Sequence, residues 1–399
     1  MHKAPWLTVL GLGEDGLDGL SPASRQVLDR AEVIMGPPRH LALLPDTGAE
    51  QVEWPVPFSD GLPILTTLRG RATVVLASGD PFWFGAGSVI ARNFEAGEWT
   101  ALPGQSTFSL AAARLGWPLE TTLTFGLHAA PLTRLRPHLS PGLRAILLLR
   151  DGKAVAELAT YLTETGFPDS ALHVMQALGG PRENTRTVSL TEALLGTFDH
   201  PVCVGLEVTG AGRAFPKASG KPDDIFENDG QITKRPVRAL TLSALAPQRG
   251  EHLWDIGGGT GSISIEWLMC DPTLTATTIE PRTDRAERIR RNADTLGQDR
   301  LHVVHGTAPE VLGGLPLPDV VFIGGGLSQT LLEWLHRSLP TGARLVANAV
   351  TLESEALLAQ WQEKLGGDLL RIELAQASAL GSMRGWNAAY PVVQWSVTL

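Results

Sequence analysis

The sequence has 399 residues, which is enough for two domains that each bury a core of their own. Its net charge of −9 argues against a nucleic-acid-binding protein, because such proteins need a broad basic surface. No apolar run approaches the ~20 residues of a membrane-spanning helix, and the start of the chain does not resemble a signal peptide. We therefore expect a cytoplasmic protein that binds neither nucleic acid nor membrane.

The cysteines and histidines predict no metal site. Cys203 and Cys270 lie far apart inside apolar segments. The histidines do not cluster, and His302 and His305, three apart on a predicted strand, should point to opposite faces.

The first half of the chain has an α/β pattern. A short apolar strand at residues 6–10 is followed by the glycine-rich turn Gly11-Leu12-Gly13. Two further strands are predicted at 31–36 and 73–77, and the second runs into Ser78-Gly79-Asp80-Pro81. Open α/β sheets bind ligands at the carboxyl ends of their strands, so this turn is a candidate binding loop.

A helix is predicted over residues 108–115, directly after Pro103-Gly104-Gln105-Ser106-Thr107. The hydroxyls of Ser106 and Thr107 have two possible uses, capping this helix or contacting a ligand, and capping is the commoner one. Further on, residues 209–229 are polar and rich in Gly, Pro, Lys and Asp without periodicity, which predicts a linker.

The second half predicts a doubly wound parallel sheet, because apolar strands alternate with helices. Right-handed crossovers should bring the carboxyl ends of these strands to one rim. The tail, including 393–397, is predicted to add to the sheet edge in antiparallel fashion. The five predicted strands are 253–256, 275–280, 301–305, 319–323 and 344–347.

A glycine-rich turn follows the first of these strands, in the stretch W-D-I-G-G-G-T-G-S from Trp254 to Ser262. Its glycines are spaced G-x-G-x-G, whereas a dinucleotide fold has G-x-G-x-x-G. Asp255 precedes the turn, and Glu280 ends the next strand 280 − 257 = 23 residues after Gly257, where an acid can accept ribose hydroxyls. The pattern favours S-adenosylmethionine (SAM) over a dinucleotide.

The helix that follows Glu280 is rich in arginine. Asp284 and Arg288, and likewise Glu287 and Arg291, have i,i+4 spacing. This spacing predicts a solvated helix face whose charges pair with one another, rather than an anion-binding patch.

The N-terminal motifs resemble the tetrapyrrole methylase family. The resemblance rests on Gly11-x-Gly13, on Ser78-Gly79-Asp80-Pro81 and on Pro103-Gly104-x-Ser106, in this order. It implies two α/β lobes that grip SAM. The chain departs from the family at Glu14, where much of the family has proline. The residues that the resemblance places at the SAM site are Gly11, Gly13, Gly79, Asp80, Trp83, Ser106 and Thr107.

The C-terminal motifs resemble the decarboxylating precorrin methyltransferase domain. They include Ile232-Thr233-Lys234, the glycine-rich turn, Gly306-x-Ala308-Pro309-Glu310 and Asn348-Ala349-Val350-Thr351. The chain departs from this family at Pro236, where a glutamate is usual. The resemblance implies a Rossmann-like fold whose SAM-binding residues are Thr233, Asp255, Gly257, Gly258, Gly259, Thr260, Gly261, Glu280 and Ala308.

Joined in this order, the halves resemble the fused precorrin methyltransferases of cobalamin biosynthesis. The resemblance implies methylation of a precorrin-6 type tetrapyrrole at carbons 5 and 15, with decarboxylation of the ring-C acetate to give precorrin-8. Residues 1–208 would methylate carbon 5, and residues 230–399 would methylate carbon 15 and decarboxylate. Two SAM sites per chain and a homo-oligomer are expected.

Residues that could act on the tetrapyrrole are harder to assign. Lys234 and Arg238 lie ahead of the glycine-rich turn, and either they bind substrate carboxylates or they are solvated charges at a helix start. Asn348 falls on the predicted rim. Two other functions remain open: a single-site SAM methyltransferase with a non-catalytic N-terminal module, and a dinucleotide-dependent oxidoreductase.

Overall fold

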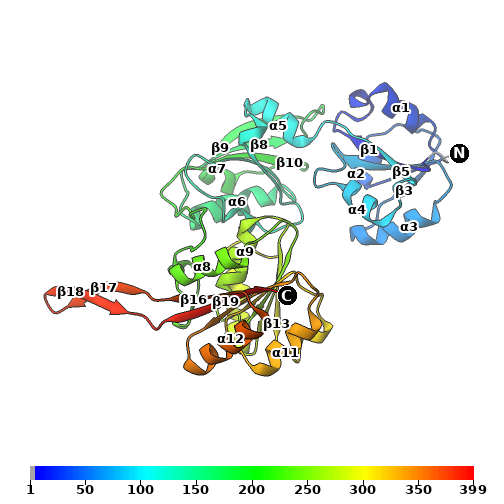
Figure 1. Ribbon diagram of the computed structural model, residues 1–399. Helices are drawn as coiled ribbons and strands as arrows, with labels where there is room; N and C mark the ends of the chain where they lie inside the picture. Colours follow the sequence, from blue (N-terminus) through cyan, green and yellow to red (C-terminus); the bar gives the residue numbers. More distant parts are fainter. Residues whose placement is uncertain (1–4) are drawn as a thin grey trace. The chain divides into compact units, whose positions relative to one another are not determined.

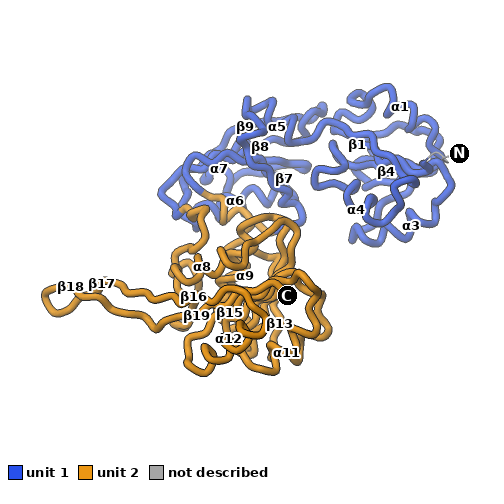
Figure 2. The backbone as a smooth tube through the Cα atoms, viewed as in Figure 1, with its two compact units in different colours: residues 1–130, 140–213 blue, residues 131–139, 214–399 orange. Residues whose placement is uncertain are grey.

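The computed structural model describes residues 5–399 (Figure 1). The chain divides into two compact units, drawn in blue and orange in Figure 2. Unit 1 comprises residues 1–130 and 140–213, and unit 2 comprises residues 131–139 and 214–399. No helix within residues 5–399 is long and apolar enough to cross a membrane.

Unit 1 has two lobes, each built on its own sheet. The first lobe is a parallel sheet of order β3-β2-β4-β1-β5. Val9 and Leu10 on β1, an inner strand, pack into different core clusters, so the sheet is covered on both faces, as parallel sheets require. Its elements are β1 Leu7–Leu12, α1 Pro22–Asp29, β2 Val33–Gly36, α2 Pro38–Leu41, β3 Glu50–Glu53, α3 Gly61–Thr67, β4 Thr73–Ser78, α4 Ala86–Asn93 and β5 Trp99–Leu102.

The second lobe is a mixed sheet of order β6-β7-β10-β8-β9, in which only β6 and β7 pair in parallel. Phe108 and Trp117 anchor the core between its sheet and helix α5. Its elements are α5 Thr107–Leu115, β6 Leu123–Gly126, β7 Arg144–Leu148, α6 Lys153–Glu164, β8 Ala171–Gln176, β9 Asn184–Ser189, α7 Leu190–Leu195 and β10 Val202–Glu207.

Unit 2 is a doubly wound sheet of order β13-β12-β11-β14-β15-β19-β16, as predicted. The first five strands are parallel, and β19 pairs with β15 in antiparallel fashion, which confirms the predicted edge addition. Its elements are α8 Arg235–Leu245, β11 His252–Ile256, α9 Ser262–Cys270, β12 Thr275–Glu280, α10 Thr283–Thr295, β13 Leu301–His305, β14 Val320–Ile323, α11 Gln329–Ser338, β15 Arg344–Ala349, α12 Leu352–Leu365, β16 Asp368–Ile372, β17 Ala375–Leu380, β18 Met383–Ala388 and β19 Val392–Thr398.

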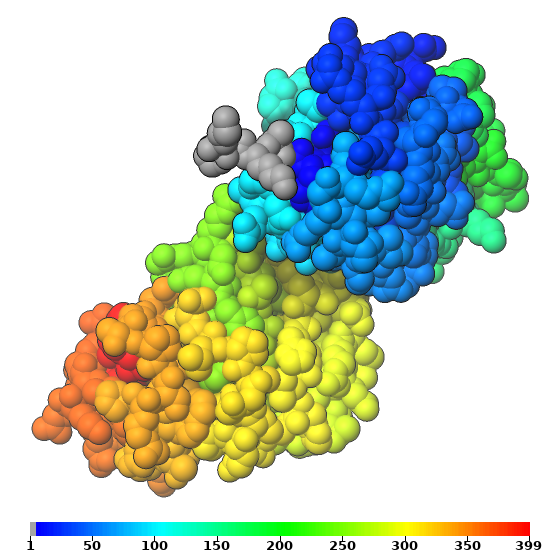
Figure 3. All heavy atoms as spheres, turned by 90° about the vertical axis from the view of Figure 1, so that its right-hand side faces the viewer, coloured from blue at the N-terminus to red at the C-terminus, as the bar shows by residue number. Residues whose placement is uncertain are grey.

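Two hydrophobic cores sandwich this sheet. Alternate residues of β11 point to opposite faces, so Leu253 packs with α8 and α9 whereas Trp254 packs with α11 and α12. In the space-filling view of Figure 3, the yellow to orange residues that follow β13 form much of the surface of unit 2 that faces the viewer. Both faces are thus closed, and ligand access is left to the rim where the parallel strands end.

The hairpin β17–β18 extends away from the sheet of unit 2 (Figure 1). Its two strands are exposed along their whole length except for Gly385. Large apolar side chains, among them Leu380, Met383 and Trp386, are at least 70% exposed. At its base, the hairpin joins strands that flank the rim of the sheet.

The segment predicted as a linker, 209–229, differs from that prediction. From residue 214 onward it packs on unit 2, where Phe215 and Phe226 are buried beside Ile265 of α9. The sequence shows no periodicity here because the segment has no regular secondary structure beyond one short 3-10 turn. Its two phenylalanines are nevertheless core residues.

A buried ion pair fastens this segment to helices α8 and α9. Arg238 on α8 and Glu266 on α9 have side chains that are 0% and 1% exposed, and Nε of Arg238 donates to Glu266 at 2.6 Å. Arg238 also donates to Asp223 at 2.9 Å and to the backbone carbonyls of Lys221 and Thr233. Glu266 accepts the backbone N–H groups of Gly220 and Lys221. The buried charges are therefore paired and hydrogen-bonded on every side.

We predict that Glu266→Ala destabilises unit 2 by about 3–5 kcal/mol, because it removes the fully buried partner of Arg238 and leaves only the partly exposed Asp223 to pair with that guanidinium. Hydrogen exchange of α8 and α9 peptides in the full chain measures the loss of protection. Glu363→Ala, at an exposed position of α12, is the control and should leave protection unchanged. Equal protection in the two variants would contradict the assigned role of the pair.

Candidate functional site

The glycine-rich turn of unit 2 lies at the carboxyl end of β11, and its glycines serve different purposes. Gly257, Gly259 and Gly261 all have positive φ, at +77°, +60° and +75°. A Cβ on Gly257 would lie 2.6 Å from the backbone of Gly325, and one on Gly258 would collide with Thr278. Gly259 differs, because a Cβ there would meet only one atom, 4.0 Å away. The turn is therefore closely packed at Gly257, Gly258 and Gly261, and open at Gly259.

Glu280 is fixed beside the open position. It is 3% exposed, one carboxylate oxygen accepts the N–H of Gly259 at 2.9 Å, and the other accepts the N–H of Arg282 at 3.1 Å. Each oxygen has a second lone pair that remains available. The carboxylate can therefore accept two ligand hydroxyls from a preset position, as the ribose of SAM requires.

Asp255 is the second acid of this site and is 1% exposed. It accepts the hydroxyl of Ser264 at 2.6 Å, and Ser264 also contacts Thr278 at 2.5 Å. Burial, with a smaller contribution from the charge of Glu280 and against the opposing effect of the Ser264 hydrogen bonds, raises the pKa of Asp255 to about 6. An acid with such a displaced pKa in a cavity is typical of a functional site.

The turn and both acids line a cavity of about 580 Å³, a size suited to a nucleoside-containing ligand. On one side it is bounded by the loops after β11, β12, β13 and β14. The opposite wall is apolar and comes from Ile372, Leu374 and Val392 at the base of the hairpin, with Tyr390 beside them. The cavity thus joins a polar pocket for a nucleoside to an apolar surface.

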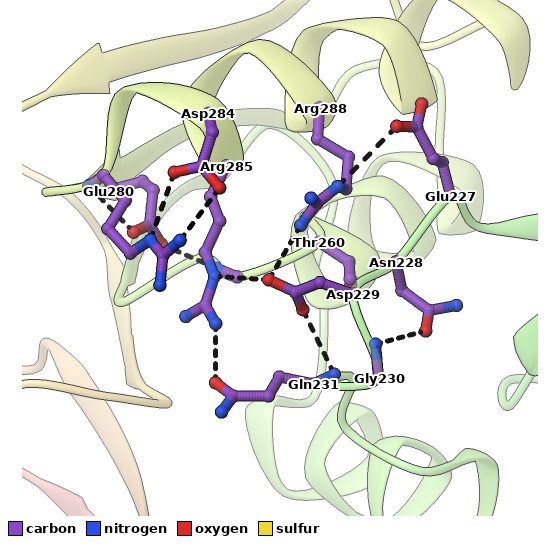
Figure 4. A network of polar contacts seen from close by, with 12 residues as sticks. Glu227, Asn228, Asp229, Gly230, Gln231, Thr260, Glu280, Asp284, Arg285 and Arg288 are labelled. Atoms are coloured by element: carbon purple, nitrogen blue, oxygen red, sulfur yellow. Dashed lines mark hydrogen bonds and ion pairs between the residues drawn. The ribbon is translucent and has the colours of Figure 1, made fainter.

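The segment from Glu227 to Gln231 lies beside the glycine-rich turn and is held by α10 (Figure 4). Asp229 pairs with Arg285 at 3.0 Å and with Arg288 at 3.1 Å, and Arg285 also donates to Gln231 at 2.7 Å. Because Gln231 itself lines the cavity, these ion pairs position one edge of the site.

The expectation that the arginines of α10 pair along their own helix is wrong. Arg288 pairs with Asp229, and Arg291 pairs with Glu227 at 2.7 Å, whereas Asp284 is bonded to Arg282. These pairs could not be predicted, because the partner carboxylates lie more than fifty residues earlier in the chain.

Unit 1 has its own cavity, of about 870 Å³, between the strand-end loops of the first lobe and the second lobe. Three loops meet there backbone to backbone. The N–H of Gly104 donates to the carbonyl of Gly79 at 3.0 Å, and a Cβ on Gly11 would collide with both of these glycines. Gly79 has a φ of +53°, and a Cβ on it would lie 2.7 Å from the Gln105 carbonyl. Only glycine allows this approach.

Both halves of the chain match families of known proteins. The Tetrapyrrole (Corrin/Porphyrin) Methylases model matches residues 7–194, and the Precorrin methyltransferase domain model matches residues 224–399. Precorrin-6Y C(5,15)-methyltransferase [decarboxylating] of Sinorhizobium sp is 48% identical over 99% of this chain and 97% of its own. The chain belongs to the precorrin-6Y C(5,15)-methyltransferase family.

Two further relatives match only part of this chain. Cobalt-precorrin-6B C(15)-methyltransferase (decarboxylating) of Salmonella typhimurium is 31% identical over 43% of this chain and 91% of its own. The crystal structure of the C-terminal domain of precorrin-6Y C5,15-methyltransferase from Rhodobacter capsulatus is 57% identical, covers 46% of this chain and all of that one, and has a TM-score of 0.45.

In unit 2 of this methyltransferase, most residues predicted from the sequence lie together. Gly261 and Arg238 do not line the cavity. Gly261 instead precedes the first turn of α9, and Arg238 is enclosed by Glu266 and its other partners, so the hypothesis that Arg238 binds a substrate carboxylate is withdrawn. The predicted residues that line the cavity are Thr233, Lys234, Asp255, Gly257, Gly258, Gly259, Thr260, Glu280, Ala308 and Asn348.

In unit 1 the outcome is similar. Ser106 accepts the N–H of Ser109 at 3.1 Å, so its hydroxyl caps α5 while the residue still lines the wall of the cavity. Gly11 does not line the cavity, because it is covered by the neighbouring loops. The predicted residues that do line it are Gly13, Gly79, Asp80, Trp83, Ser106 and Thr107.

We predict that Asp255→Asn removes a pH dependence of stability. The folded pKa of about 6 lies above the unfolded value of 3.8, so protonation stabilises the fold below pH 4, and this stabilisation is lost as the pH rises through 6. Relative to Asp255→Asn, the parent chain should lose about 2 kcal/mol between pH 4 and pH 7. Hydrogen exchange of β11 peptides along a urea series measures this.

Asp294→Asn, at an exposed position of the same unit, is the control and should show no such relative change. If Asp255→Asn and the parent chain kept a constant stability difference across this pH range, the account of Asp255 would fail.

Proposed function

We propose that this chain methylates a precorrin-6 type tetrapyrrole twice and decarboxylates it once, with SAM bound separately in each unit. Unit 1 would methylate carbon 5, and unit 2 would methylate carbon 15 and remove the ring-C acetate carboxyl, to give precorrin-8. The observation that carries the proposal is a pair of cavities, one per unit, each built from glycine-rich loops at the carboxyl ends of strands. The full-length relative is named for the C(5,15) methylations and the decarboxylation.

The division of labour has its own support. The Salmonella typhimurium relative matches 43% of this chain, yet its name includes both C(15) methylation and decarboxylation. One domain of that size is therefore enough for both steps in that relative's name. We assign these two steps to unit 2 of this chain, because unit 2 contains the matched precorrin methyltransferase domain.

The residues of unit 2 fit SAM, which supplies a methyl group on a positively charged sulfur. Glu280 would accept the ribose hydroxyls, and the open backbone at Gly259 would let the ligand approach closely. Asp255 lies at the base of the turn, where its carboxylate would support the amine end of the ligand through the loop. These groups bind and orient, and they do not need to move a proton.

Orientation of the tetrapyrrole would supply most of the rate, because an electron-rich ring carbon can attack a methyl group that is held in line with it. Asn348 is suited to this role. Its amide nitrogen donates to Thr241 at 2.9 Å and its oxygen accepts from Gln394 at 2.9 Å, so the side chain cannot rotate. The apolar wall with Tyr390 would hold the ring and exclude water.

Decarboxylation sets a different demand. A cation at the departing acetate would stabilise the ground state and slow the reaction. Lys234 is exposed at the start of α8 and lines the cavity, so we assign it to one of the carboxylates that the substrate keeps. The homo-oligomer expected from the family resemblance stays a prediction.

Variants that block one cavity at a time test the proposal. Gly259→Val forces a branched side chain into a backbone with φ of +60° at the ligand-facing position, and it should slow C(15) methylation and decarboxylation about a hundredfold. Methylation at carbon 5 should persist. Mass spectrometry of the tetrapyrrole after incubation with SAM separates these products.

Two controls accompany this test. Gly250→Val has similar backbone strain, with φ of +85° and open space, but lies outside the cavity, and it should leave all products unchanged. Ala129→Trp, at an exposed position that lines the cavity of unit 1, should remove only the carbon-5 methylation. The proposal of two independent sites would be contradicted if Gly259→Val lost both methylations while Gly250→Val gave the same products as the parent chain.

A further inference from the structure

The cavity of unit 1 contains an arginine that the sequence did not single out. Arg39 on α2 lines this cavity and its side chain is 30% exposed. One terminal nitrogen donates to Glu14, which is 8% exposed and follows the first glycine-rich turn. The other carboxylate oxygen of Glu14 accepts from Arg182 at 3.1 Å. A single buried carboxylate thus holds two guanidinium groups, one from each lobe.

Two neutral groups fix the other edge of Arg39. Its second terminal nitrogen donates to Nε2 of His40 at 2.9 Å and to the hydroxyl of Ser78 at 3.0 Å. A guanidinium can only donate, so Nε2 of His40 accepts and the ring is neutral. Burial, and then the charge of Arg39, lower the pKa of His40 to about 3, in agreement with a neutral ring. His40 therefore positions Arg39 without adding charge.

This arrangement leaves one positive charge uncompensated, and it leaves some N–H groups of Arg39 without a hydrogen-bond partner among Glu14, His40 and Ser78. Arg39 and Arg182 carry two positive charges, and Glu14 cancels only one of them. Of the five N–H groups of a guanidinium, three are used in the bonds to Glu14, His40 and Ser78. The remaining charge lies at a cavity whose wall is largely apolar, including Val56, Leu76 and Met175, where an ion pair is screened less than in water.

We infer that Arg39 is a specificity-determining residue that binds a side-chain carboxylate of the tetrapyrrole, and that Glu14 is the positioning residue that aims it. This inference rests on the proposed methylation of a tetrapyrrole in unit 1. Arg39 selects substrates with a carboxylate at that edge of the macrocycle. The carboxylate of SAM has the same chemistry, and the experiment below separates these two sources.

Glu14 suits a positioning role because it is locked from both sides. The loop of the second lobe packs directly on it, and a Cβ on Gly180 would lie 2.6 Å from the Glu14 side chain. Glu14 therefore sets where Arg39 and Arg182 meet. This is also the position where the chain departs from the common family pattern, and the structure gives that departure a purpose.

The test uses the full chain with Arg39→Met, Arg39→Lys and the control Arg69→Met. Arg69 lies in the same lobe and pairs with Glu98 at 2.8 Å, but it does not line the cavity. Arg39→Met should raise the KM for tetrapyrrole in the carbon-5 methylation roughly ten- to a hundredfold, with kcat much less affected. Arg39→Lys keeps the positive charge but loses the planar guanidinium. Its KM for tetrapyrrole should therefore lie between those of the parent chain and Arg39→Met.

Decarboxylation in unit 2 serves as an internal standard and should be unchanged in all three variants. Calorimetric titration with S-adenosylhomocysteine should give the parent affinity at both sites of Arg39→Met. Arg69→Met should match the parent chain in every measurement.

Two results would overturn the inference. One is a parent-like KM for tetrapyrrole in Arg39→Met. The other is a weakened S-adenosylhomocysteine site with an unchanged tetrapyrrole KM, which would assign Arg39 to the carboxylate of SAM. Failure of the proposed function looks different, because the parent chain itself would then show no carbon-5 methylation.

Discussion

The hydrogen bond from the backbone N–H of Gly259 to the carboxylate of Glu280 is the interaction on which the site of unit 2 depends. It joins the end of β12 to the turn after β11, and it fixes a buried carboxylate before any ligand arrives. A side chain at Gly259 would stand where the ligand must approach, so the bond and the open space come from the same residue. The site is thus preorganised by backbone geometry, and the reaction needs little reorganisation of the protein.

In unit 1, different loops preorganise the cavity through backbone geometry. Gly11, Gly79 and Gly104 bring three strand ends into backbone contact, and the cavity opens beside them. In each unit an arginine paired with a buried carboxylate then secures the neighbouring segments, Arg238 through Glu266 and Arg39 through Glu14. The two arginines differ in one respect: Arg238 has no exposed surface, whereas Arg39 reaches its cavity.

The five parallel strands of unit 2, three parallel strands of unit 1 (β1, β2 and β4) and the residues of the glycine-rich turns could be predicted from the sequence, because each depends on local pattern. The edge strands β3 and β5 of unit 1 were not predicted. A period of apolar residues marks a strand, and a glycine with an acid at a strand end marks a turn at the rim. Contacts between distant segments could not be predicted. Asp229 gave no sign of its pairing with Arg288, and Phe226 gave no sign of its burial, since both lie in a stretch without periodicity.

The same limit applies to side chains within the sites. The sequence identified Arg238 as a cation near the turn but could not show that its guanidinium points into the core. It identified Glu14 as a departure from the family pattern but not its partners Arg39 and Arg182. The role of a charged side chain depends on the groups that it contacts, and those groups come from other segments of the chain.

The central claim is that each unit forms a complete binding site of its own for SAM. Equilibrium dialysis of the full chain against labelled S-adenosylhomocysteine tests it most directly. The account predicts saturation at two equivalents per chain. Saturation at one equivalent would contradict it.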